Sequence, residues 1–212
     1  MISKRINYKK ELLSFRDKNE HLKIIERRVP HESDLFFKKL LKFLSSISGF
    51  VNYSSANKDI KTLLKEKLPQ NIKSDPFYEK WIQDMSCICK LFCEFQKEDR
   101  ISFWIGSKRG CKRFHVDMVP YRLLLTYLGQ GTEYLPNYAA NRNAFFQNRP
   151  NNEIVKDQSA LKFVNNWDIA IFRGGRNGIL HRTPTSALNS GSSILMKLDN
   201  QSFLQSMKLN VA

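Results

Sequence analysis

Three residues in the second half of the chain have the types and the spacing of a metal-binding triad. His115 and Asp117 stand two positions apart in FHVDM, and His181 follows much later in NGILHRTP. Residues i and i+2 of a strand project to the same face, so the first two side chains can point to one side of a sheet. Two imidazoles and one carboxylate on one face of an octahedron leave the other positions open for dioxygen and substrate. The triad therefore predicts a site for one divalent iron and for oxygenation chemistry.

Each member of the triad also has a structural interpretation. Either histidine could be a core residue whose ring is satisfied by backbone partners, and Asp117 could be a turn or strand-end residue. Asp117, however, is flanked by Val116 and Met118. Burying an unpaired carboxylate costs several kcal/mol, and a bound cation would remove that cost. The combination of the three residues therefore favours the metal site.

The elements that must position the triad are predicted to be strands from residue 101 onward. Four short apolar or β-branched runs are each bounded by Gly, Asn or Pro, which is typical of strands. These runs are ISFWIG, YRLLLTYLG, DIAIFRG and SSILMKLD. The asparagine-rich residues 137–152 are expected to form a long loop. This loop either closes over a substrate through Phe145 and Phe146 or is an ordinary surface excursion.

The first half is predicted to be helical, with a polar loop around VNYSSANKD. After Ser33 and Asp34, apolar residues recur at three- and four-residue spacing, which indicates an amphipathic helix. These residues are Phe36, Phe37, Leu40, Leu41, Leu44 and Ile47. Another helix is expected at 58–66, and a longer one from Pro76 to about Gln96 carries an apolar stripe. The stripe consists of Phe77, Trp81, Met85, Ile88, Cys89 and Phe92.

Length and composition fit one compact domain with an appendage. A chain of 212 residues can bury one sizeable core, and a content of 42% hydrophobic and 12% aromatic residues is that of an ordinary globular protein. We expect an α+β protein in which a helical region, residues 1–98, buttresses a metal-binding region, residues 99–212. The charged residues 1–30 are expected to pair as a short helix or to stay partly mobile.

The sequence favours a soluble, cytoplasmic protein without a membrane partner. No stretch reaches the roughly 18 apolar residues that span a bilayer, and the basic start MISKRINYKK has no apolar signal core. Cys87, Cys89 and Cys93 lie too close together in SCICKLFC for a secreted disulfide framework. We expect reduced thiols, with Cys89 packed as a small hydrophobe rather than joined with Cys93 in a metal site.

The net charge of +15 comes from 35 Lys and Arg against 20 Asp and Glu, and both halves of the chain share the excess. A generally basic surface is therefore favoured over a nucleic-acid interface. The run SKRGCKR beside the triad is expected to be a solvated loop that could contact an anionic substrate. A small-molecule or anionic substrate is the expected partner, nucleic acid is the less favoured one, and the oligomeric state is left open.

The order of these features resembles the core of the iron- and 2-oxoglutarate-dependent oxygenase superfamily over about residues 101–199. That order is H-x-D, strand, glycine-containing turn, loop, apolar strand, glycine turn and histidine. The resemblance implies a double-stranded β-helix, or jelly roll, of the cupin-like type with the N-terminal helices packed on it, Fe(II), and 2-oxoglutarate as co-substrate. CKRFHVD, TYLGQGTEYLP and HRTP also resemble motifs of an uncharacterised bacterial family, which implies that Cys111, Arg122 and Arg182 lie near the triad.

The chain departs from the superfamily pattern at the residue that binds 2-oxoglutarate. The superfamily uses an arginine about ten residues beyond the distal histidine, where it forms a bidentate fork with the acid. This chain has Gly191 at that distance. Lys197 is the nearest basic residue on the last predicted strand, and Arg122 and Arg182 are rival candidates. We therefore predict that one of these three residues binds the co-substrate.

Two functions compete for the same triad. The first is a non-haem Fe(II) oxygenase or hydroxylase that uses 2-oxoglutarate. The second is a cupin-like metal-binding protein without oxidative turnover, such as a zinc-linked sensor or chaperone. A sulfur ligand would favour zinc, but an extended strand at ~3.3 Å per residue would place Cys111 roughly 13 Å from His115. Direct ligation by Cys111 is therefore not favoured.

Overall fold

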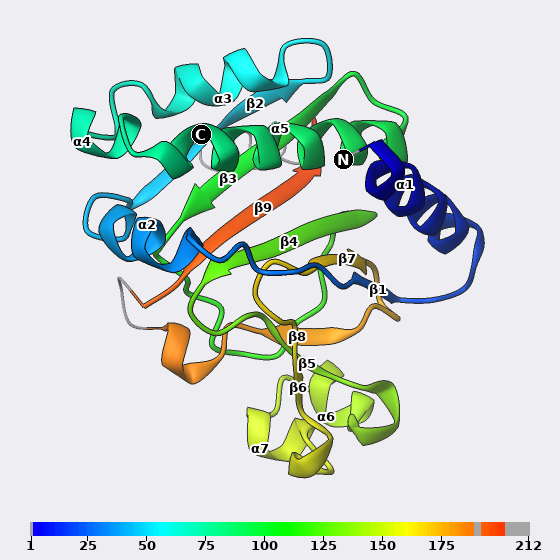
Figure 1. The fold of residues 1–212 in the computed structure, drawn as a ribbon. Coiled ribbons are helices and arrows are strands. Elements are labelled where there is room, and N and C mark those ends of the chain that lie inside the picture. Colours follow the sequence, from blue (N-terminus) through cyan, green and yellow to red (C-terminus); the bar gives the residue numbers. More distant parts are fainter. Residues whose placement is uncertain (1, 189–191, 202–212) are drawn as a thin grey trace, which may run out of the picture.

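The computed structural model describes residues 2–188 and 192–201, and within these the chain forms two antiparallel sheets (Figure 1). The larger sheet has six strands in the order β1-β7-β4-β9-β3-β2, and the smaller has three in the order β6-β5-β8. The strands are β1 (Leu22–Ile25), β2 (Ser46–Asn52), β3 (Arg100–Gly106), β4 (Tyr121–Leu128), β5 (Glu133–Leu135), β6 (Lys162–Phe163), β7 (Ile169–Arg173), β8 (Leu180–Arg182) and β9 (Ile194–Asn200). The predicted α+β class is confirmed. Gly191 lies outside the described residues.

Helices cover one face of the large sheet, and the small sheet lies on its other side (Figure 1). The helices of the first half are α1 (Ile2–Asp17), α2 (Ser33–Leu40), α3 (Ala56–Leu64), α4 (Gln70–Lys73) and α5 (Pro76–Gln96). Two short helices, α6 (Arg142–Phe146) and α7 (Asn151–Ile154), lie beyond the small sheet. None of the helices in the described part of the chain is long and apolar enough to span a bilayer.

Both faces of the large sheet are covered, one by helices and the other by the small sheet (Figure 1). Successive residues of a strand point to opposite faces, so they pack into different clusters. In β4, Leu123 and Leu125 join the core beneath the helices, whereas Leu124 joins a second cluster on the side of the small sheet. In β9, Met196 joins the core beneath the helices, and Leu195 joins the cluster on the side of the small sheet. The runs predicted as strands are therefore continuously apolar, and all four of them are confirmed as β3, β4, β7 and β9.

The longest helix, α5, confirms its predicted apolar stripe. Phe77, Trp81, Met85, Ile88, Cys89 and Phe92 are all buried. Burial raises the pKa of the Cys89 thiol well above its ordinary value, which fits the predicted role as a small hydrophobe. Pro76 stands in the first turn, and the side chain of Asp75 caps the helix by accepting a hydrogen bond from the Phe77 N–H at 3.0 Å.

Replacing Asp75 by alanine should lower the free energy of unfolding by about 1 kcal/mol at neutral pH, because the cap is lost. Burial acts to raise the pKa of Asp75, but the Phe77 amide and the Lys39 ammonium outweigh it and lower the pKa. A lowered pKa stabilises the fold above the ordinary carboxyl pKa and loses that effect as the pH falls through the folded value. Urea denaturation should therefore show a wild-type advantage at pH 7 that vanishes in acid. A difference that persists in acid would contradict this account.

The first half also contains strands that periodicity did not predict. The expected amphipathic helix ends at Leu40, and Ile47 lies in β2, where it pairs with Ile105 of β3. The serines and the glycine in SSISG are poor helix formers, so the segment joins the sheet edge instead. VNYSS was expected to be loop, but its first two residues also belong to β2, and residues 1–30 contribute both α1 and β1. The predicted helical region 1–98 thus supplies two strands to the sheet of the second half.

The expected long loop at 137–152 is wrong in part, because it contains α6, α7 and a short 3-10 helix at Asn137–Ala139. Asn141 caps α6 by accepting a hydrogen bond from the Ala144 N–H at 3.2 Å, so an asparagine that suggested a loop starts a helix. The segment packs on its own small core, which includes Phe114, Leu135 and Ile154. Phe145 is half-buried there and Phe146 is exposed.

Candidate metal centre

The backbone brings His115 and His181 side by side at the edge of the small sheet. Each donates its N–H to the carbonyl oxygen of the other at 3.0 Å, and Thr183 N–H donates to Cys111 O at 2.9 Å. Residues 111–115 therefore run antiparallel to β8 as a further segment of this sheet. The two imidazole rings end up with their centroids 4.4 Å apart.

Asp117 completes a compact cluster with the two histidines. One ligand atom from each of the three residues lies within 4.8 Å of the others, and Asp117 Oδ2 is 3.3 Å from His181 Nε2. His181 and Asp117 are buried, and His115 is half-buried. The structure thus brings together all three residues that the sequence predicts as ligands, and their binding of a metal stays a prediction.

Hydrogen bonds orient both imidazoles with one nitrogen toward the centre of the cluster. His115 Nδ1 lies 3.0 Å from Arg113 O, and His181 Nδ1 lies 3.1 Å from Ile179 O. A carbonyl oxygen only accepts, so Nδ1 carries the proton in each ring and Nε2 keeps its lone pair for a metal. Burial, opposed by the Asp117 carboxylate, lowers the pKa of His181 to about 4. The ring is therefore neutral at pH 7, as a metal ligand must be.

Asp117 has one oxygen engaged and one that fits a metal. Oδ1 accepts a hydrogen bond from Arg122, whereas Oδ2 is buried and has no hydrogen-bond partner within the described residues. A buried carboxylate oxygen without a partner is unfavourable by an amount on the order of several kcal/mol. Since the nearby His181 Nε2 carries no proton, it cannot satisfy Oδ2. A cation between the two imidazoles and this oxygen would satisfy all three.

Arg122 of β4 holds the carboxylate of the triad in place. It donates to Asp199 of β9 twice, from Nε to Oδ1 at 2.7 Å and from Nη2 to Oδ2 at 3.1 Å, and also to Asp117. The side chains are 13% exposed for Arg122 and 1% for each aspartate. Burial acts against the guanidinium charge, but the two carboxylates outweigh it and raise the pKa of Arg122. Such hydrogen-bonded partners of a ligand fix its orientation.

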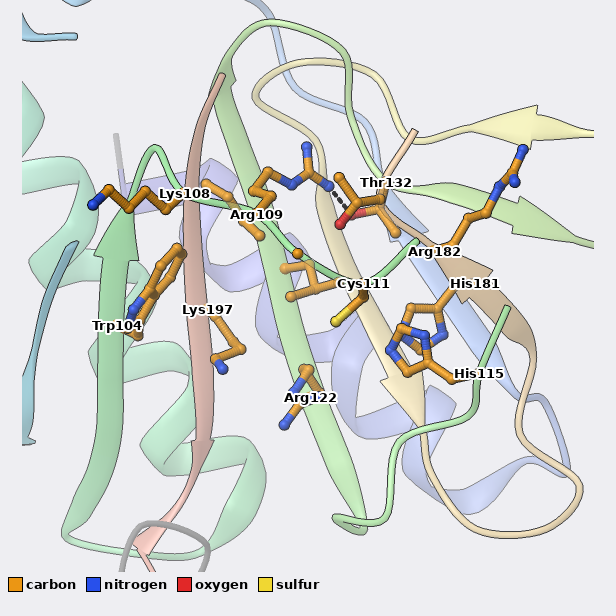
Figure 2. Close-up of a pocket in the computed structure, with 14 residues that line it drawn as sticks. Trp104, Lys108, Arg109, Cys111, His115, Arg122, Thr132, His181, Arg182 and Lys197 are labelled. Atoms are coloured by element: carbon orange, nitrogen blue, oxygen red, sulfur yellow. Dashed lines mark hydrogen bonds between the residues drawn. The ribbon is translucent and has the colours of Figure 1, made fainter. Parts of the chain in front are cut away.

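A cavity of about 270 Å³ adjoins the triad, and Figure 2 shows the residues that line it. His115, His181 and all three residues predicted to bind a co-substrate line this cavity. Arg182 is bound bidentately by Glu133, at 2.8 and 3.0 Å. Lys197 lies with its ammonium 5.6 Å from the centre of the Trp104 ring, and burial lowers its pKa.

Four cavity residues come from the run SKRGCKR, which was expected to be a solvated loop: Lys108, Arg109, Gly110 and Cys111. Arg109 is only 8% exposed, so the expectation is wrong for this residue. It donates hydrogen bonds to Gln130 O and Thr132 Oγ1 of the β4–β5 turn. No periodicity in the sequence signals this burial, because the partners come from a distant turn. Cys111 also lines the cavity, but the metal-ligand cluster found in the described residues does not include it.

The fold and the site define the protein as a mixed α+β protein with two antiparallel sheets and a candidate His-Asp-His metal centre. It belongs to the family described as "Protein of unknown function (DUF1826)", whose sequence profile matches residues 8–199. The predicted membership in an uncharacterised family is therefore confirmed. No curated protein matches the chain.

Several solved structures are similar to the chain, among them two at 9% identity each. One is described as a selenomethionine-labelled Fe(II)/(alpha)ketoglutarate-dependent dioxygenase TqaL, with 9% identity, a TM-score of 0.49, and coverage of 92% of this chain and 88% of that chain. The other is a bsmA homolog (Mpe_A2762) from Methylobium petroleophilum PM1, with 9% identity, a TM-score of 0.42, and coverage of 91% and 92%. Both TM-scores lie below 0.5, so neither neighbour establishes a shared fold.

Proposed function

We propose that the protein is a non-haem Fe(II)-dependent oxygenase built on a double-stranded β-helix. The path of the chain supports this architecture, because consecutive segments alternate between the two sheets. β3 lies in the large sheet, residues 111–115 along the small one, β4 in the large, β5 and β6 in the small, β7 in the large, β8 in the small and β9 in the large. A jelly roll winds its strands between two facing sheets in this manner.

The observation that carries the proposal is the cluster of the two imidazoles with the Asp117 carboxylate. One possible ligand atom of each residue lies within 4.8 Å of the others, and Asp117 Oδ2, which has no hydrogen-bond partner within the described residues, lies 3.3 Å from His181 Nε2. Two histidines and one carboxylate are the donor set of non-haem iron oxygenases and leave coordination positions open. Iron held there would supply the activation of dioxygen for oxidation of a substrate. The protein's part is to keep the buried His181 imidazole neutral, to orient Asp117 through Arg122, and to place the site beside a cavity.

The proposed co-substrate is 2-oxoglutarate, with Lys197 as the favoured residue for its carboxylate. Arg122 and Arg182 already hold protein carboxylates in bidentate geometry. Lys197 stands on β9, the last strand, and lines the same cavity as the two histidines. A lysine there would replace the arginine fork of the superfamily by a point charge.

Succinate release from 2-oxoglutarate tests the function. Protein supplied anaerobically with Fe(II) and then exposed to air should release succinate, and Asp117→Ala should not. Lys197→Met should raise the 2-oxoglutarate concentration for half-maximal rate by about tenfold, because a charge-assisted contact of about 1.4 kcal/mol is lost. Lys38→Met, which changes an exposed lysine on α2, serves as the control. Tight zinc binding with no Fe(II)-stimulated succinate would contradict the proposal and favour a metal-binding protein without turnover.

A further inference from the structure

Arg109 is a buried cation whose contacts within the described residues include no carboxylate. It is 8% exposed, and the ion pairs of the described chain, residues 2–188 and 192–201, do not include it. The two other arginines that line the cavity differ in this respect, because Asp117 and Asp199 balance Arg122, and Glu133 balances Arg182. Arg109 therefore brings an unbalanced positive charge into the walls of the cavity.

Within the described residues, the side-chain hydrogen bonds of Arg109 go to neutral acceptors and do not use the Nε–H. Nη1 donates to Gln130 O at 2.9 Å, and Nη2 donates to Thr132 Oγ1 at 3.2 Å. The Nε atom is buried and has no hydrogen-bond partner in the part of the chain that the structure describes. Burial lowers the pKa of the guanidinium to about 10, since only the Cys111 thiol acts in the opposite direction. A buried charge without an opposite charge is unfavourable, so the site favours an incoming anion.

Arg109 lines the same cavity as His115 and His181 of the candidate metal centre. In Figure 2, Arg109 and Thr132 lie at the top of the view, Arg122 lies at the bottom, Cys111 lies between them, and the two histidines lie to the right of Cys111. Lys197 adds a further cation to the same walls. A molecule in this cavity can therefore contact the metal centre and the Arg109 end at the same time.

We infer that Arg109 binds a carboxylate of a small organic acid that occupies this cavity. A guanidinium presents its donors in a fork that matches the two oxygens of a carboxylate, and the Thr132 hydroxyl beside it holds the fork in position. The carboxylate belongs either to the co-substrate or to the molecule that is oxidised. The inference rests on the proposed function only for the contact between the acid and a metal, and the contact with Arg109 needs no metal.

The test is the binding of 2-oxoglutarate and of glutarate to zinc-loaded protein, measured by isothermal titration calorimetry. Zinc prevents turnover, and glutarate lacks the 2-oxo group that chelates a metal. Arg109→Gln should weaken the binding of glutarate at least tenfold, and Arg109→Lys should weaken it less, because it keeps the charge but loses the fork. Lys112→Gln removes the same charge from an exposed side chain of the same segment and should leave both affinities unchanged.

The two acids identify the source of the carboxylate. Weaker binding of both to Arg109→Gln would assign the carboxylate to the co-substrate, and weaker binding of glutarate alone would assign it to a second acid. Equal affinities in wild type and Arg109→Gln, or no binding of either acid to wild type, would overturn the inference. Melting temperatures show whether each variant is folded. If Arg109→Gln does not fold, the affinities of Arg109→Lys replace it in the comparison with wild type. Zinc binding measured separately distinguishes failure of the metal site from failure of the Arg109 contact.

Discussion

Replacing His115 by alanine should abolish the stabilisation of the protein by divalent metal while leaving the fold intact. His115 is half-buried at a sheet edge, so the substitution removes a ligand without opening a core cavity. Loss of a partner that merely orients a ligand weakens metal binding by about 10- to 100-fold, and loss of the ligand itself should exceed that range. Wild type at a metal concentration of 100 times its dissociation constant gains about 2.7 kcal/mol, which corresponds to a rise in melting temperature of roughly 5 to 10 °C.

The matched control for this variant is His31→Ala. His31 is exposed and lies outside the triad, so wild-type metal stabilisation should persist in that protein. Differential scanning fluorimetry with Zn(II), and with Fe(II) under anaerobic conditions, compares the three proteins. Equal metal-induced shifts in wild type and His115→Ala would contradict the assignment of the triad.

Replacing Arg122 by methionine should destabilise the metal-free protein by about 3–5 kcal/mol, which is the typical effect of removing one partner from a buried ion pair. The substitution leaves two carboxylates, Asp117 and Asp199, with only 1% of each side chain exposed. For a chain of this length the loss corresponds to a fall in melting temperature of roughly 6 to 20 °C. Bound metal should reduce the deficit, since it restores a positive charge beside Asp117.

The pH dependence provides a check on this cause. Burial already raises the pKa of Asp199 in the wild type despite the arginine, and removal of the arginine raises it further. A carboxyl with a raised folded pKa destabilises the fold above that value and ceases to do so once protonated, so the deficit should shrink as the pH falls. Lys38→Met, which breaks an exposed pair with Asp34, should cost less than about 1 kcal/mol. A similarly small effect for Arg122→Met would contradict the role given to the pair.

The triad could be predicted from the sequence because its information is local. His115 and Asp117 share a strand-like spacing, and His181 follows a strand and a glycine turn that return the chain to the same sheet. The strands β3, β4, β7 and β9 were likewise predictable, since each is an apolar run bounded by turn residues. These features predict the three ligands, whereas the backbone pairing of His115 with His181 that brings them together is a long-range contact.

The remaining parts of the site depend on contacts that the sequence does not reveal. Arg109 is buried because it donates to residues 21 and 23 positions further along the chain, whereas its own neighbours are polar and basic. β1 forms a strand because β7 offers it an edge from the other half of the chain. The spacing of Ile47 fits both a continued helix α2 and the alternation of a strand. Its pairing with β3 selects the strand. The ion pairs that Arg122 and Arg182 form with protein carboxylates also depend on long-range contacts, so the sequence could not predict them.

The most direct test of the metal centre is anomalous scattering from crystals of the protein loaded with Fe(II) under anaerobic conditions. Data collected on the two sides of the iron absorption edge should show one anomalous peak per chain, in contact with His115, Asp117 and His181. The peak should be absent from His115→Ala crystals treated in the same way. An iron peak elsewhere, or none at the triad of the wild-type protein, would contradict the assignment.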